Sequence, residues 1–127
     1  MEHRSPRILV VDDEDAIRLT LDLLLRKRGY AVVTAASGEA AVALLEQQPF
    51  DLLLLDLMMS GLSGIDVARR ARTIQPAAAV LILTGSSPVE GAAGTEDLEQ
   101  FDYVLKTASP EDVLQRVAAI LTERQSR

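Results

Sequence analysis

The sequence predicts an α/β domain in which a five-stranded parallel sheet is covered by helices on both faces. Five short apolar runs alternate with helical hydrophobic spacing along the 127 residues, which is the pattern of a doubly wound fold. The runs are continuous rather than alternating, as in strands that are buried on both faces. A chain of this length suits one such domain, and we expect residues 1–127 to form it.

The expected strands are the five apolar, β-prone runs. They cover Ile8–Val11, Tyr30–Thr34, Leu52–Leu55, Val80–Leu83 and Tyr103–Leu105. The first three each precede a segment with helical spacing, so that strands and helices alternate along the chain.

Four helices have clear start or stop signals. They are expected over Asp15–Lys27, Ser37–Leu45 and Ser63–Thr73, and from Ser109 towards residue 121. Ser37 and Ser109 are of the residue type that caps helix N-termini, and Pro110 suits the first helical position. Gly29 is placed to end the first helix. A fifth helix, the fourth in chain order, is expected to be short or frayed near Thr95–Gln100, because each glycine just before it costs a helix about 1 kcal/mol.

The first expected helix has two distinct faces. Its apolar face consists of Ile17, Leu21, Leu24 and Leu25, and we expect it to pack on the sheet. Leu19 and Leu23 lie on the opposite side, so they are expected to be exposed. An i, i+4 pair of exposed leucines is a candidate docking patch.

Composition narrows the classes of function. The net charge of −6 argues against a surface that binds the phosphate backbone of nucleic acid directly. With no cysteine, the chain has no disulfide and no thiolate nucleophile or metal ligand. No apolar run is long enough to cross a bilayer, and no signal-peptide region follows the start. We therefore expect a cytoplasmic domain that binds neither nucleic acid nor membrane.

Reactive side chains follow four of the expected strands. They are Asp12 and Asp13 after the first, Asp56 after the third, Thr84 with Gly85 after the fourth, and Lys106 after the fifth. In a doubly wound sheet, ligands bind beyond the carboxyl ends of the strands, where these side chains converge. Neighbouring carboxylates repel one another unless a cation intervenes, and an all-oxygen site suits Mg²⁺.

The same groups can support phosphoryl transfer. A carboxylate can attack phosphorus to give an acyl phosphate. The phosphoryl oxygens then need a cation, a lysine and hydroxyl or main-chain donors. In a simpler reading, Asp12 and Asp13 only cap the first helix; that accounts for one acid but not for the whole convergent set.

Four short motifs stand at these strand ends. They are Val11-Asp12-Asp13-Glu14, Asp56-Leu57-Met58-Met59 with Gly61 and Gly64 following, Leu83-Thr84-Gly85 and Tyr103-Val104-Leu105-Lys106. With these motifs in this order, the chain resembles the receiver domain of two-component response regulators from end to end. The resemblance implies a chemotaxis-regulator-like fold with the flavodoxin-like strand order 2-1-3-4-5.

The resemblance implies an acceptor and a metal site. Asp56 would be the phosphoacceptor. Asp13, Asp56 and the main-chain carbonyl of Met58 would bind Mg²⁺ directly, and Asp12 would act through water.

The resemblance also implies how the phosphoryl group is held. Thr84 would hydrogen-bond it and Lys106 would pair with it, while the main-chain N–H groups of Leu57 and Gly85 would be further donors. Tyr103 matches the aromatic switch position that turns inward when the threonine moves.

The implied role is a signalling switch rather than an enzyme with a separate substrate. The expected donor is a sensor histidine kinase or a phosphotransfer protein, and the expected partner is an output domain or protein. A weak dimer that forms on phosphorylation is also compatible with the resemblance. The chain would catalyse only its own phosphorylation and dephosphorylation.

Two positions depart from the family pattern. The family usually has proline where Ser60 stands, and a proline, often after a cis bond, where Thr107 follows Lys106. A cis bond before threonine costs about 2.5–4 kcal/mol, so we expect a trans bond.

Three other functions remain open at this point. A receiver-fold interaction module that is never phosphorylated would share every residue above. A phosphatase of the haloacid dehalogenase type needs a second acid two residues after the nucleophile, where this chain has Met58. A flavin-binding domain needs a phosphate loop after the first strand, where this chain has acids.

Overall fold

The computed structural model describes residues 5–85, 101–106 and 109–125. Its elements are β1 (Arg7–Val11), α1 (Asp15–Lys27), β2 (Ala31–Ala35), α2 (Gly38–Gln47), β3 (Leu52–Asp56), α3 (Gly64–Ile74), β4 (Ala79–Thr84), β5 (Asp102–Leu105) and α5 (Pro110–Gln125). The strands form one parallel sheet in the order β2-β1-β3-β4-β5. This confirms the predicted fold class and strand order. The helix expected at Thr95–Gln100 and the bond between Lys106 and Thr107 lie outside the described residues.

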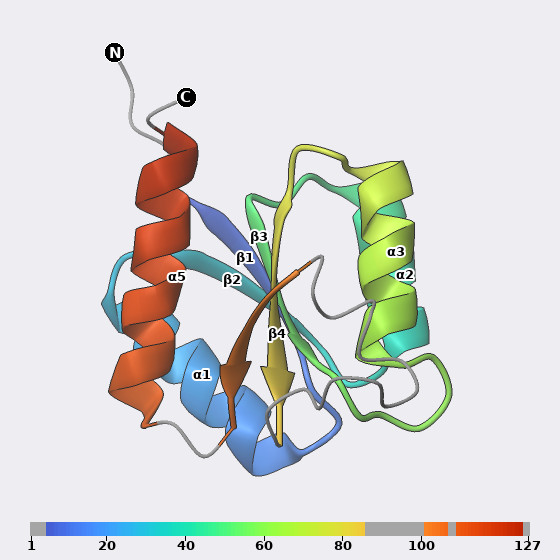
Figure 1. The fold of residues 1–127 in the computed structure, drawn as a ribbon, viewed down its shortest axis with the longest axis horizontal. Coiled ribbons are helices and arrows are strands. Elements are labelled where there is room, and N and C mark those ends of the chain that lie inside the picture. The colour runs from blue at the N-terminus through green and yellow to red at the C-terminus, as the bar shows by residue number, and fades with distance from the viewer. Residues whose placement is uncertain (1–4, 86–100, 107–108, 126–127) are drawn as a thin grey trace.

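The sheet is the middle of three layers. Helices α1 and α5 cover one face, and α2 and α3 cover the other (Figure 1). Successive strand residues point to opposite faces, so each continuous apolar run supplies both layers. The α1/α5 side buries Ile8, Val10, Leu52, Leu54, Leu81 and Leu83, and the α2/α3 side buries Leu9, Val11, Leu53, Leu55 and Ile82.

Helix α1 packs as its periodicity predicts. Leu21 and Leu25 are buried in the α1/α5 layer, and Ile17 and Leu24 pack against the same core. Leu19 and Leu23 are 62% and 56% exposed, on the opposite side. The amphipathic assignment of this helix is therefore confirmed.

Capping groups fix most helix boundaries. The Ser37 hydroxyl accepts from the main chain of α2, and Ser63 and Asp66 form a reciprocal capping box at the start of α3. The Ser109 hydroxyl accepts a main-chain N–H of the first turn of α5. Gly29 has φ of 91°, the left-handed conformation that ends α1.

The second strand begins one residue later than the sequence predicts. The N–H of Tyr30 donates to the carbonyl of Leu25 and so completes the C-terminal turn of α1. Pairing with β1 therefore starts at Ala31. The other expected elements agree with the structure to within two residues at the boundaries that the sequence assigned, except that α5 continues to Gln125.

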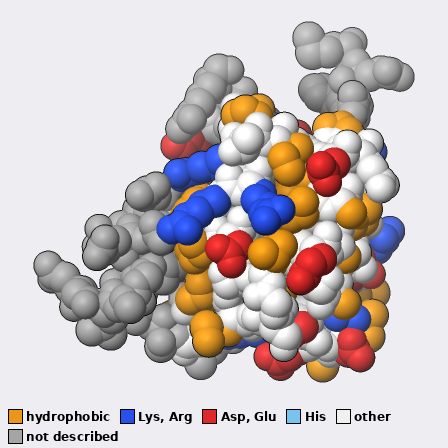
Figure 2. Space-filling model, turned by 90° about the vertical axis from the view of Figure 1, so that its right-hand side faces the viewer, with side chains coloured by type: hydrophobic (Ala, Val, Ile, Leu, Met, Phe, Trp, Pro, Cys, Tyr) orange, Lys and Arg blue, Asp and Glu red, His pale blue; other side chains and the backbone are white. Residues whose placement is uncertain are grey.

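Charged side chains are interspersed on the outer face of α2 and α3. Basic and acidic groups lie beside one another there (Figure 2). On α3, Arg69 and Arg70 are exposed. Arg72 is also exposed, but its guanidinium stacks over the Phe101 ring at 4.0 Å and so links α3 to the residue before β5.

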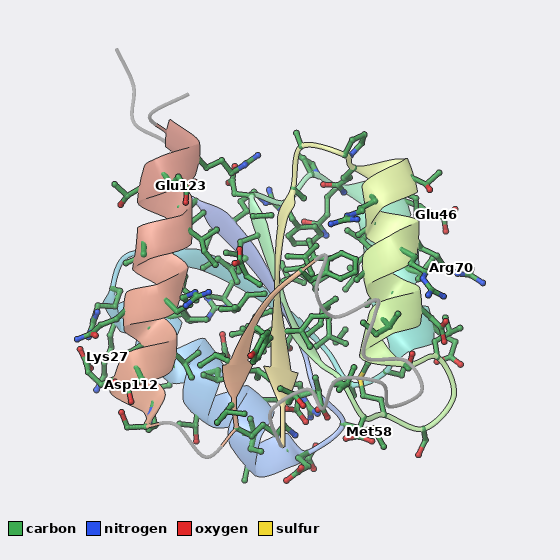
Figure 3. All side chains as sticks on the ribbon, viewed as in Figure 1. Lys27, Glu46, Met58, Arg70, Asp112 and Glu123 are labelled. Atoms are coloured by element: carbon green, nitrogen blue, oxygen red, sulfur yellow. The ribbon has the colours of Figure 1, made fainter. Side chains whose placement is uncertain are left out.

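The parallel arrangement gives the sheet a distinct carboxyl edge. The arrowheads of β4 and β5 mark this edge in Figure 1, and Met58 lies at the same end of the molecule in Figure 3. Glu46 and Glu123 lie towards the other end (Figure 3). None of the helices in the described part of the chain combines the length and apolar character needed to cross a membrane.

Candidate functional site

Three carboxylates meet at the carboxyl edge. Asp12 and Asp13 follow β1, and Asp56 is the last residue of β3; one carboxylate oxygen from each lies within 4.8 Å of the others. Asp12 and Asp56 are buried, with 0% and 2% of their surface exposed, whereas Asp13 is exposed. The structure thus brings together the three acids that the sequence singles out.

Lys106 lies among these acids. Its Nζ is 3.1 Å from Oδ1 of Asp56 and 3.4 Å from Oδ2 of Asp12. Its main-chain N–H donates to the carbonyl of Thr84 at 2.7 Å, which fixes the end of β5 beside β4. A third carboxylate, that of Glu14, accepts from Nζ at 3.1 Å. No role for Glu14 was predicted from the sequence, although it is the third acid in the run after β1.

The main chain around Asp12 is held from two directions. The N–H of Glu14 donates to Oδ1 of Asp12 at 2.9 Å. Nη1 of Arg18, one turn along α1, donates to the Asp12 carbonyl at 2.8 Å. These contacts fix Asp12 at the start of the site.

Two buried carboxylate oxygens have no hydrogen-bond donor among the described residues. They are Oδ2 of Asp12 and Oδ2 of Asp56. Buried oxygens of this kind are rare in folded proteins because their desolvation is costly. A hard cation with oxygen ligands would compensate both, and Mg²⁺ commonly binds one or two carboxylates while keeping several waters. The donor set therefore fits the predicted Mg²⁺ site.

The environment of Asp56 raises the pKa of its carboxyl group. Burial and then the charge of Asp12 raise the pKa of Asp56 to about 6, although Lys106 and the N–H of Met58 act in the opposite direction. Burial would lower the pKa of Lys106, but its contacts with Glu14, Asp56 and Asp12 outweigh burial and raise that pKa. Lys106 is therefore a cation at neutral pH. Asp56 is a nucleophilic carboxylate whose ionised form is stabilised by nearby positive charge.

The main-chain donor nearest the acceptor is not the predicted one. The N–H of Leu57 donates to the carbonyl of Leu83 at 2.8 Å as part of the sheet, so it is already used. The N–H of Met58 instead reaches Oδ1 of Asp56 at 3.3 Å. In this state the N–H of Leu57 is therefore committed to the sheet and that of Met58 faces Asp56, while the role of Leu57 towards a phosphoryl group stays a prediction. Gly85, the other predicted donor, is exposed beside Thr84.

The two predicted switch residues lie on neighbouring strands. Thr84 is the last residue of β4 and is 3% exposed. Tyr103 is on β5, paired with Ile82, and is 37% exposed. An outward tyrosine beside a buried threonine is the starting arrangement that the predicted switch requires; the switching roles themselves stay predictions.

Comparison with known families decides the identity of the domain. Residues 8–118 match the response regulator receiver domain family. The chain belongs to this family. The receiver domain is 37% identical over 123 residues to the transcriptional regulatory protein AfsQ1 of Streptomyces coelicolor, covering 95% of this chain and 54% of that protein. It is 41% identical over 120 residues to the transcriptional regulatory protein ResD of Bacillus subtilis, covering 91% and 48%. It thus spans about half the length of these relatives.

Solved structures agree with this assignment. A CheY-like receiver domain from Methanospirillum hungatei JF-1 has a TM-score of 0.86 at 26% identity, with 97% of this chain and 98% of that chain covered. The response regulator TrrA of Thermotoga maritima, solved in complex with Mg²⁺-BeF, has a TM-score of 0.77 at 33% identity, with 90% and 97% covered.

Proposed function

We propose that this receiver domain accepts a phosphoryl group on Asp56 from a histidine kinase or phosphotransfer protein, in the presence of Mg²⁺. Phosphorylation then changes its surface for an output domain or protein. The observation that carries the proposal is the position of Asp56: it is buried, one of its oxygens lacks a donor among the described residues, and the other faces Lys106 at 3.1 Å.

The proposed reaction moves the phosphoryl group from nitrogen to oxygen. A carboxylate oxygen of Asp56 forms a bond to phosphorus, and the bond from phosphorus to the imidazole nitrogen of the donor breaks. The electron pair leaves with that nitrogen. Lys106, Thr84 and the N–H of Met58 would donate to the phosphoryl oxygens as charge builds on them.

Asp13, Asp56 and the Met58 carbonyl would hold Mg²⁺ directly, and Asp12 would act through water. The bound cation would neutralise charge between the carboxylates and the phosphoryl group. The two buried oxygens without a donor support this set, as does the Mg²⁺-BeF complex of the related TrrA. We infer no separate substrate: the domain would catalyse only its own phosphorylation and dephosphorylation.

The proposal is tested with a small phosphoryl donor. Incubation with acetyl phosphate and Mg²⁺ should increase the intact mass by one phosphoryl group, and EDTA should prevent the gain. A folded protein whose mass stays unchanged under these conditions would instead favour the alternative of a receiver-fold interaction module that is never phosphorylated.

A further inference from the structure

Lys106 contacts one carboxylate that the proposed reaction does not use. The side chain of Glu14 is 61% exposed, whereas those of Asp12 and Asp56 are 0% and 3% exposed. Oε1 of Glu14 is nevertheless as close to Nζ of Lys106 as the acceptor carboxylate is, at 3.1 Å. Glu14 comes from the β1–α1 connection and Lys106 from the end of β5, so this pair joins distant parts of the chain.

Helix capping does not account for the Glu14 side chain. Glu14 is the N-cap residue of α1, but its side chain makes no capping hydrogen bond. Only its main chain serves the helix, since its carbonyl accepts the N–H of Arg18 at 3.0 Å. Within the described residues, the contact that its carboxylate makes is the one with Lys106.

Three carboxylates already surround Lys106 in this state. An ammonium group has three N–H donors, and three carboxylates lie 3.1–3.4 Å from Nζ. An incoming phosphoryl group therefore finds Lys106 occupied, and one partner has to be released. Asp12 and Asp56 are buried and fixed by main-chain contacts. The exposed pair with Glu14 is the one that water screens, so it can be released without leaving a buried carboxylate unpaired.

Lys106 also has room to move. Its side chain lines a cavity of about 260 Å³ between α1, β4 and α5, together with Ile17, Leu83 and Val113. The aliphatic part of the lysine can therefore shift within the site without displacing a packed core residue.

We propose that Glu14 is a positioning residue that holds the Lys106 ammonium at the outer side of the site before phosphorylation and releases it to the arriving phosphoryl group. Glu14 thereby slows the loading of Asp56. This inference rests on the proposed function, since it concerns the same site.

The kinetic test compares two variants of Glu14 with a distant control. Glu14→Gln removes the charge and keeps the length, whereas Glu14→Asp keeps the charge and shortens the side chain beyond the reach of Lys106. Glu46→Gln removes an equal charge from the exposed end of α2, at the other end of the molecule (Figure 3). With acetyl phosphate and Mg²⁺, both Glu14 variants should be phosphorylated about threefold faster than wild type, the size expected of one half-exposed ion pair. Glu46→Gln should react at the wild-type rate.

The pattern of rates separates this inference from simpler accounts. If only Glu14→Gln is faster, Glu14 acts by repelling the anionic donor and not by holding Lys106. If neither Glu14 variant is faster, the positioning role is wrong although the wild type is still phosphorylated. If the wild type itself gains no phosphoryl group, the proposed function is wrong, and the role of Glu14 that rests on it is wrong as well.

A second readout needs neither metal nor phosphate. Urea unfolding of wild type, Glu14→Gln, Lys106→Met and the double variant measures the coupling between the two side chains. The loss of stability from Glu14→Gln should disappear when Lys106 is already Met. Equal effects of Glu14→Gln in both backgrounds would overturn the proposed contact.

Discussion

Gly64, the first residue of α3, lies directly against the main-chain oxygen of Asp56. A Cβ at position 64 would be 2.3 Å from that oxygen and 2.9 Å from Cα of Leu57. Because both contacts are with main chain, a larger residue must move the end of β3, which carries the acceptor. Gly64→Ala should therefore lower the free energy of unfolding by about 1–3 kcal/mol, the usual cost of overpacking.

Urea unfolding measures this cost, and Gly85→Ala is the control for stability. None of the described residues lies within 4 Å of a Cβ at Gly85, so that variant should unfold at the wild-type midpoint. Gly64→Ala should also be phosphorylated more slowly, because the acceptor is displaced. If Gly64→Ala is as stable as wild type, α3 does not constrain Asp56 as the structure indicates.

The ionised acceptor should destabilise the metal-free fold. The pKa of Asp56 is raised from 3.8 to about 6, so the folded state binds this proton more tightly than the unfolded chain does. The penalty is absent below pH 3.8, grows as the pH rises towards 6, and is complete above it. Asp56→Asn should therefore unfold with a free energy up to about 3 kcal/mol higher than wild type at pH 7, at roughly 1.4 kcal/mol per unit of pKa.

Urea unfolding in EDTA across pH 4 to 8 measures the stability difference between Asp56→Asn and wild type, and so checks both its sign and its size. The advantage of Asp56→Asn should shrink as the pH falls from 6 to 4, and added Mg²⁺ should restore much of the wild-type stability. An advantage that does not change with pH would show that burial of the Asp56 charge is not its cause.

The sequence predicted the fold and the position of the site well because both follow from periodicity. Continuous apolar runs specify strands buried on two faces, and parallel strands carry the residues after them to one edge. The sequence could not predict which of two adjacent residues of the same type is buried. Asp12 and Asp13 are both aspartates after β1, yet the first is buried and the second is exposed.

The sequence could not predict hydrogen bonds that depend on the local path of the chain. Leu57 was expected to donate to the phosphoryl group, but in this state its N–H pairs with Leu83 in the sheet, and the N–H that faces Asp56 comes from Met58. The contact between Glu14 and Lys106 joins residues 92 positions apart. The sequence signal for that contact was an acid that follows two candidate site acids, and it did not indicate a lysine as the partner.

Tyr103 gives the proposed switch a direct spectroscopic test. The chain has two tyrosines, Tyr30 and Tyr103, so labelling with 3-fluorotyrosine gives two ¹⁹F signals, which Tyr30→Phe assigns. Tyr103 is 37% exposed on β5, whereas Tyr30 packs on the core before β2, which starts at the opposite edge of the sheet. Beryllofluoride with Mg²⁺ should move the Tyr103 signal and leave that of Tyr30 in place. An unmoved Tyr103 signal in a protein that binds beryllofluoride would rule out the switch.

Met58 should set the lifetime of the phosphorylated state. Its side chain is 75% exposed two residues after the acceptor, where it can cover the approach of a water that attacks the phosphoryl group. A thioether cannot orient this water as an amide can, so Met58→Asn should accelerate loss of the phosphoryl group. The rate is followed by intact mass in excess Mg²⁺ after the donor is removed. Met58→Leu, which is also apolar, should decay like wild type; an asparagine variant that decays no faster would show that Met58 does not control access of water.

The central claim is that Asp56 itself carries the phosphoryl group, and mapping the modified residue tests it most directly. Wild type is treated with acetyl phosphate and Mg²⁺ and then with borohydride, which reduces an aspartyl phosphate to homoserine. Peptide sequencing by mass spectrometry should find homoserine at position 56 and nowhere else, and Asp56→Asn should yield none. Homoserine at Asp12 or Asp13 of the wild type, or a folded wild type that is never reduced, would contradict the account.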